Sequence, residues 1–147
     1  MINLATIMAQ VQDWLKTDPA LAGFTVTRSE KFNDDPNCAA NGWIGIYRRS
    51  VNYDPRNLGD VPNNYEGEID FLVVVQRMSM KSGEHCEDLL EDSTKKVLDR
   101  VVQIPRTYID HFSDIDIDYT YLEAEEKTLY HQGSLITFTA DVSFEVK

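Results

Sequence analysis

Apolar residues recur at helical spacing in two segments of the chain. The first stripe comprises Leu4, Ile7, Met8, Val11, Trp14 and Leu15. The second comprises Cys86, Leu89, Leu90, Val97, Leu98, Val101 and Val102. Because an α-helix has 3.6 residues per turn, each stripe lies on one face of a helix. We therefore expect an N-terminal helix that ends by Asp18-Pro19 and a central helix that begins after the N-cap Ser82 and ends before Pro105.

Regular alternation of apolar and polar residues predicts strands through most of the remaining sequence. We expect a short strand at 24–28 and two long antiparallel strand pairs, 43–51 with 65–76 and 115–126 with 134–146. The strands of the first pair are joined by a long polar loop, a kind of segment that is usually functional or mobile. The strands of the second pair are joined by a turn.

The two strand pairs differ in the composition of their faces. In the first pair, the face that carries Glu66 and Glu68 becomes apolar at Leu72, so we expect this strand to pass from an exposed end to a covered end. The second pair has a continuous apolar face and is expected to belong mostly to the core, with its turn near 131–133. Its apolar residues are Ile115, Ile117, Tyr119 and Tyr121 on one strand and Ile136, Phe138, Ala140, Val142, Phe144 and Val146 on the other.

Together these elements predict one α+β domain that spans residues 1–147. We expect a mainly antiparallel sheet of about five strands, with the N-terminal helix and the single central helix packed on it. The polar end of the first strand pair and its long loop form an extended β-hairpin arm. A chain of this length buries enough apolar surface to fold without a metal or a disulfide.

The balance of charge narrows the possible functions. The chain carries 25 acidic and 14 basic side chains, so its formal net charge is −11. Binding to the outside of a nucleic acid needs clustered Lys and Arg, and this balance disfavours it. Negative charge commonly serves solubility; a sharper interpretation is a surface that repels DNA and lets it slide past. The longest apolar run, 71–75, is too short to span a bilayer, so we expect no membrane partner.

The two cysteines, Cys38 and Cys86, are far apart in the sequence, and the N-terminus lacks the features of a signal peptide. We therefore expect free thiols in a reducing compartment. Cys86 belongs to the run Glu84-His85-Cys86-Glu87, but a structural zinc site needs four ligands at suitable spacing. A helix start with a buried thiol is the favoured interpretation.

Other candidate reactive groups also favour structural roles. The run Asp114–Asp118 resembles the start of a calcium loop, but Tyr119 stands where that loop needs glycine, so the solvated face of a strand is favoured. His111 and His131 fall at predicted loop positions and are interpreted as surface histidines. The sequence has no motif for a catalytic nucleophile, a phosphate loop or a dinucleotide site. We expect no catalytic residues, no metal and no cofactor.

Aromatic and basic residues gather in the first strand pair and its loop, 52–64. Tyrosine, tryptophan and arginine are enriched at binding hot spots. The candidate contact residues are Trp43, Tyr47, Arg48, Arg49, Tyr53 and Arg56. An alternative, compatible with contact, is that the arginines pair across the strands with Glu66, Glu68 or Asp70.

This layout resembles the tail terminator family of tailed phages, also called tail completion or tail-to-head joining proteins. The resemblance covers nearly the whole chain: the N-terminal helix, the hairpin 43–51 with 65–78, the helix after Ser82 and the closing strand pair, which ends in Thr137–Phe144. It lies in the order and length of the elements.

The resemblance implies a structural protein of the virion tail or neck, assembled in the host cytoplasm. Members form a hexameric ring that caps the head-proximal end of the tail tube, ends tube polymerisation and offers a docking surface to the neck of the filled head. The implied partners are further copies of the chain, the tail tube protein and a head-tail connector protein, and DNA only passes through the lumen. The candidate lumen residues are Glu66, Glu68, Asp114, Asp116 and Asp118.

Three other interpretations remain open at the level of sequence. The first is another neck, stopper or tube component. The second is an acidic inhibitor that mimics DNA and binds a host protein. The third is a small enzyme whose site has no recognised motif. A tube subunit polymerises alone, whereas a terminator stops at a ring. A DNA mimic needs carboxylates spaced over a continuous surface.

Overall fold

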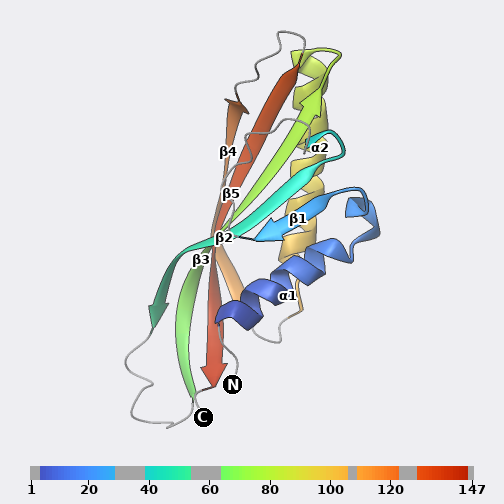
Figure 1. The fold of residues 1–147 in the computed structure, drawn as a ribbon. Helices are drawn as coiled ribbons and strands as arrows, with labels where there is room; N and C mark the ends of the chain where they lie inside the picture. The colour runs from blue at the N-terminus through green and yellow to red at the C-terminus, as the bar shows by residue number, and fades with distance from the viewer. Residues whose placement is uncertain (1–3, 29–38, 54–63, 106–108, 123–128, 146–147) are drawn as a thin grey trace.

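The structure is a computed structural model that describes residues 4–28, 39–53, 64–105, 109–122 and 129–145 (Figure 1). Its elements in chain order are α1 (Leu4–Lys16), the 3-10 turn η1 (Pro19–Leu21), β1 (Thr25–Arg28), β2 (Trp43–Tyr53), β3 (Asn64–Ser79), α2 (Gly83–Val102), β4 (Ile109–Leu122) and β5 (Tyr130–Glu145). The expected α+β fold, with an N-terminal helix, a central helix and a mainly antiparallel five-stranded sheet, is confirmed.

All five strands belong to one sheet in the order β1-β2-β3-β5-β4. The short β1 runs parallel to β2, and the other neighbours are antiparallel. The central pair is β3 with β5, which are in register along their whole length, from Asn64 opposite Glu145 to Ser79 opposite Tyr130. The two predicted strand pairs are thus joined side by side, and the arm contains β5 as well as the predicted hairpin (Figure 1).

Both helices pack on the same face of this sheet and on each other. Trp14 Nε1 on α1 donates a hydrogen bond of 2.7 Å to the carbonyl oxygen of Arg100 on α2, and Arg100 Nε donates one of 2.9 Å to the carbonyl oxygen of Trp14. The Arg100 guanidinium also lies 3.4 Å from the centre of the Trp14 ring, within the range of a cation–π contact. The buried core between helices and sheet includes Ile7, Val11, Leu15, Leu90, Val97, Ile46, Phe71, Val73, Ile136 and Phe138.

The helix ends follow the local chemistry of the sequence. Helix α1 ends at Lys16, and the side chain of Asp18 caps the next turn by accepting a hydrogen bond from the Ala20 amide at 3.0 Å. Ser82 is the N-cap of α2, as predicted, and its hydroxyl accepts a hydrogen bond from the His85 amide at 3.0 Å. Helix α2 ends before Pro105.

Three local predictions for the second strand pair are wrong. Residues 131–133 lie within β5 instead of a turn, because β3 offers this segment backbone partners as far as Ser79. His131 is therefore 3 % exposed and not a surface residue, and its ring Nε2 lies 2.7 Å from Gln76 Nε2. His111 lies within β4 and not in a loop.

The prediction of a continuous apolar face on β4 is also wrong. A register shift between Ser113 and Asp116 interrupts the pairing of β4 with β5. Such a bulge breaks the alternation of side chains, and Ile115 is 42 % exposed as a result. Tyr119, on the same edge strand, is 58 % exposed.

Candidate functional site

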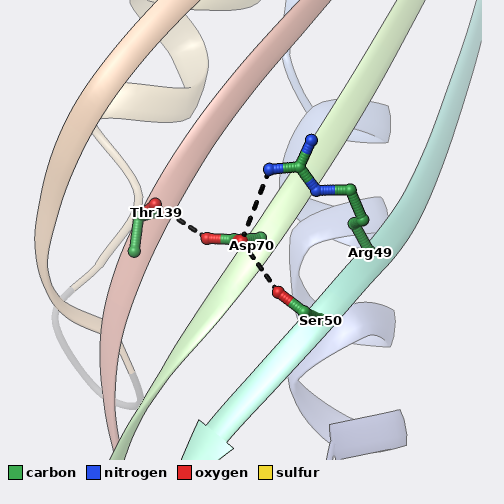
Figure 2. A network of polar contacts seen from close by, with 4 residues as sticks. All are labelled: Arg49, Ser50, Asp70 and Thr139. Atoms are coloured by element: carbon green, nitrogen blue, oxygen red, sulfur yellow. Dashed lines mark hydrogen bonds and ion pairs between the residues drawn. The ribbon is translucent and has the colours of Figure 1, made fainter.

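The sheet face opposite α1 and α2, which we call the helix-free face, gathers acidic side chains from three strands. On β3, Glu68 and Asp70 lie on this face because they alternate with residues of the helix-side core. Glu68 lies opposite Asp141 on β5, and the same register places Asp116 and Asp118 of β4 on this face. Figure 2 looks onto it, with α1 behind the strands.

Only part of the helix-free face is open to solvent. Its buried side chains include Trp43, Leu72, Val74, Gln76 and His131. Glu68, Asp116 and Asp118 are exposed. The predicted passage of β3 from an exposed to a covered end is therefore confirmed. Trp43, a candidate contact residue, is 2 % exposed and belongs to the interior of the subunit.

Asp70 joins three strands at the base of the arm (Figure 2). Its carboxylate accepts hydrogen bonds from Ser50 Oγ on β2 at 2.7 Å and from Thr139 Oγ1 on β5 at 2.8 Å, and Arg49 Nη2 lies 3.6 Å away. The hydrogen bond from Ser50, followed by that from Thr139 and the charge of Arg49, holds the pKa of Asp70 below its ordinary value of 3.8. The alternative that an arginine pairs across the strands is thus confirmed for Arg49 and Asp70.

Arg48 and Arg49 lie where β2 extends past β1, and we call them the basic edge. Strand β1 pairs only with Trp43–Ile46, so beyond this point the outer side of β2 has no strand partner among the described residues. A register shift between Arg48 and Ser50 marks a β-bulge at Arg49. Both arginines are exposed.

The remaining candidate contact residues are less defined. Tyr47 is half-buried, and burial raises the pKa of its hydroxyl group while the charge of Arg49 opposes that rise. The side chain of Tyr53 lies outside the described part of the structure, as does the whole of Arg56.

Strand β4 forms the opposite edge of the sheet and carries three aspartates that were predicted to share one face. Asp116 and Asp118 do share it. Asp114 lies inside the bulge with φ of 51°, a left-handed conformation, so strand alternation does not set its direction. The side chain of Glu66, the other candidate lumen residue on β3 besides Glu68, is not among those described.

A pocket of about 250 Å³ lies between α2 and the β4 edge. Its lining residues are Glu87, Glu91, Tyr119, Thr120 and Gln132. Glu87 and Glu91 are one helical turn apart on α2 and both are exposed. The pocket therefore combines two carboxylates with an exposed aromatic ring, a set of groups that suits a positively charged side chain. We call Glu87, Glu91, Asp116 and Asp118 the acidic edge.

Groups with potential for chemistry near the start of α2 serve local structure. Ser79 Oγ lies 2.7 Å from His85 Nδ1 and accepts a hydrogen bond from the Lys81 amide at 3.1 Å, which fixes the turn before the helix. Cys86 is buried, as predicted, and burial raises the pKa of its thiol. Among the described residues no group of three or more His, Cys, Asp or Glu is placed to hold a metal ion.

Comparison with known proteins leaves these features to be interpreted from the structure itself. No protein-family model matches the sequence, and no curated protein matches it either. Within the described part of the chain, neither helix has the length and apolar character needed to cross a membrane.

Sequence reasoning missed two parts of the candidate site. Asp141 was assigned to a solvent face, but nothing local shows that it lies opposite Glu68. The pocket was also missed, because its carboxylates on α2 and its tyrosine on β4 are separated by about a fifth of the chain. Only the packing of α2 beside the sheet edge brings these groups together.

Proposed function

We propose that this chain is a structural subunit of a phage tail, of the tail terminator type. Six copies form a ring that caps the head-proximal end of the tail tube, ends tube polymerisation and presents a docking surface to the neck of the filled head. Its partners are further copies of itself, the tail tube protein and a head-tail connector protein, and DNA only passes through the lumen. The protein assembles in the host cytoplasm and resides in the tail or neck of the virion.

The observation that supports this proposal best is the acidic helix-free face. Glu68, Asp116, Asp118 and Asp141 lie on one side of a sheet whose other side is covered by helices. If this side faces the lumen, the helices form the outer layer and DNA meets a surface of its own sign of charge. Like charge keeps a passing polyanion from binding to the wall.

Of two alternatives, one fits the structure less well and the other is distinguished only by its assembly. A DNA-mimicking inhibitor needs a continuous acidic surface, whereas on this face the guanidinium of the exposed Arg49 lies 3.6 Å from the carboxylate of Asp70. The physical arguments given above apply equally to a tube or stopper component. Only its mode of assembly distinguishes such a component from a terminator.

The first experiment is light scattering of the purified protein across a concentration series, followed by negative-stain electron microscopy. The expected result is a closed six-fold ring that does not grow longer at high concentration. Open-ended tubes would favour a tube subunit, and a monomer at every concentration would overturn the proposal.

The orientation of the ring is tested by its affinity for double-stranded DNA. Rings of the wild type should not retain DNA, whereas Glu68→Lys/Asp141→Lys rings should retain it because the lumen gains basic side chains. The matched control is Asp88→Lys/Asp99→Lys, which makes the same change of charge at exposed positions on α2. Equal retention by the two variants would contradict a lumen lined by the helix-free face.

A further inference from the structure

We propose that the basic edge of one copy docks on the acidic edge of a second copy of the same chain. Arg48 enters the pocket beside Glu87 and Glu91, and Arg49 meets Asp116 and Asp118. This inference rests on the proposed function, because it names the contact through which the ring closes.

The two edges are complementary in charge. The basic edge is an adjacent pair of exposed arginines, and the acidic edge offers four exposed carboxylates. Arginine favours such contacts because its planar guanidinium binds carboxylates with two parallel hydrogen bonds. Tyr119, 58 % exposed beside the pocket, adds a ring face on which a guanidinium can stack.

The complementarity holds separately on each face of the sheet. Arg48 lies in register with Phe71, a residue of the helix-side core, and the pocket carboxylates also lie on the helix side. Arg49 instead reaches Asp70 on the helix-free face, where Asp116 and Asp118 also lie. Suppose that two copies lie edge to edge with their helices on the same side of the combined sheet. Arg48 of one copy then meets the pocket carboxylates of the other on the helix side, and Arg49 meets Asp116 and Asp118 on the helix-free face.

Strand direction agrees with this arrangement. Within one subunit β2 and β4 run antiparallel to each other, as the chain of pairings through β3 and β5 shows. A second copy placed beside β4 without turning its sheet over thus brings its β2 antiparallel to β4, the relation found in most of the sheet. Because the two edges differ, the contact is head-to-tail, which is the kind that closes into a ring.

Bulges on both edges make the contact selective. The register shifts at Arg49 and between Ser113 and Asp116 interrupt the outer backbone of β2 and β4. Bulges and charged side chains on edge strands prevent indiscriminate pairing with other sheets. Recognition between copies then depends on the matched charges rather than on a long backbone ladder.

The test uses two charge-reversed full-length variants, Arg48→Glu/Arg49→Glu for the basic edge and the fourfold Glu87→Arg/Glu91→Arg/Asp116→Arg/Asp118→Arg for the acidic edge. In each variant both edges carry the same sign of charge. Each alone should assemble at least about a hundredfold more weakly than the wild type, since apposed like charges oppose association. An equimolar mixture should assemble again, with the two variants alternating, because every contact then joins opposite charges. Light scattering gives the assembly state, and differential labelling gives the composition.

Matched controls carry the same charge changes elsewhere: Lys95→Glu/Lys96→Glu and the fourfold Asp13→Arg/Asp88→Arg/Asp92→Arg/Asp99→Arg, all at exposed positions. These should assemble like the wild type. The docking contact is overturned if either edge variant assembles normally by itself, or if the folded mixture does not assemble. Neither result contradicts the proposal that the wild type forms a ring. A wild type that never assembles overturns both proposals.

Circular dichroism establishes that each variant is folded. If a reversed variant does not fold, neutral variants replace it: Arg48→Gln/Arg49→Gln for the basic edge and Glu91→Gln/Asp118→Asn for the acidic edge. Weakened assembly of these variants supports the contact, and assembly equal to that of the wild type overturns it.

Discussion

Replacing Asp70 by Asn removes the charge at the junction of the three arm strands and keeps the size of the side chain. The wild-type carboxylate accepts hydrogen bonds from Ser50 and Thr139. Hydrogen bonds to charged groups contribute about 1.5–3 kcal/mol and neutral ones about 0.5–1.5 kcal/mol, so each bond loses about 1 kcal/mol. The Asp70 side chain is 26 % exposed, and water and screening offset part of this loss. We expect the free energy of unfolding to fall by about 1 kcal/mol in total.

The assay is urea unfolding at neutral pH, followed by tryptophan fluorescence. The matched control is Glu68→Gln, which removes a carboxylate from the same face of β3. Glu68 is exposed and lies opposite Asp141, so removing its charge relieves a like-charge pair. We expect this control to change stability by no more than about 0.5 kcal/mol, in the stabilising direction.

The pH dependence gives a second test of the same reasoning. The pKa of Asp70 is lower in the folded chain than its ordinary value of 3.8, so the unfolded chain binds this proton more readily. The stabilisation is therefore fully present above 3.8 and is lost as the pH falls through the lowered folded-state pKa. The difference between wild type and Asp70→Asn should shrink in that acidic range. An Asn variant as stable as the wild type at neutral pH, or a difference that persists unchanged in strong acid, would refute the reasoning.

Two further predictions concern single positions. Gly42 has φ of +105°, and a Cβ there would lie 2.5 Å from the ring of Phe24, so Gly42→Ala should lower the free energy of unfolding by about 1–3 kcal/mol. Gly23→Ala, where the nearest atom lies 3.9 Å away, should have little effect on urea unfolding, and equal effects would contradict this account. Burial raises the pKa of the Cys86 thiol, so in a Cys38→Ser background a thiol reagent should react with the native protein far more slowly than with the unfolded chain. Equal rates would show that Cys86 is accessible.

The sequence by itself determined most of the elements and their faces. The stripe of α1, the cap of α2 at Ser82 and the change of β3 from polar to apolar at Leu72 all depend on neighbours within a few residues. Helix periodicity, capping and strand alternation are local rules, so they can be read without knowing what lies across the fold. Strand alternation, another local rule, also identified the shared face of Asp116 and Asp118 on β4.

The tertiary structure decided how these elements meet. Alternation shows which residues share a face but not which strand lies alongside, so the full pairing of β3 with β5 was hidden, and with it the burial of His131. The bulge that removes Asp114 from the alternation of β4 arises from the shift in register between β4 and β5. The pocket exists only because α2 packs beside the edge of β4. Each of these features depends on contacts between residues far apart in the chain. Local sequence patterns do not specify such contacts.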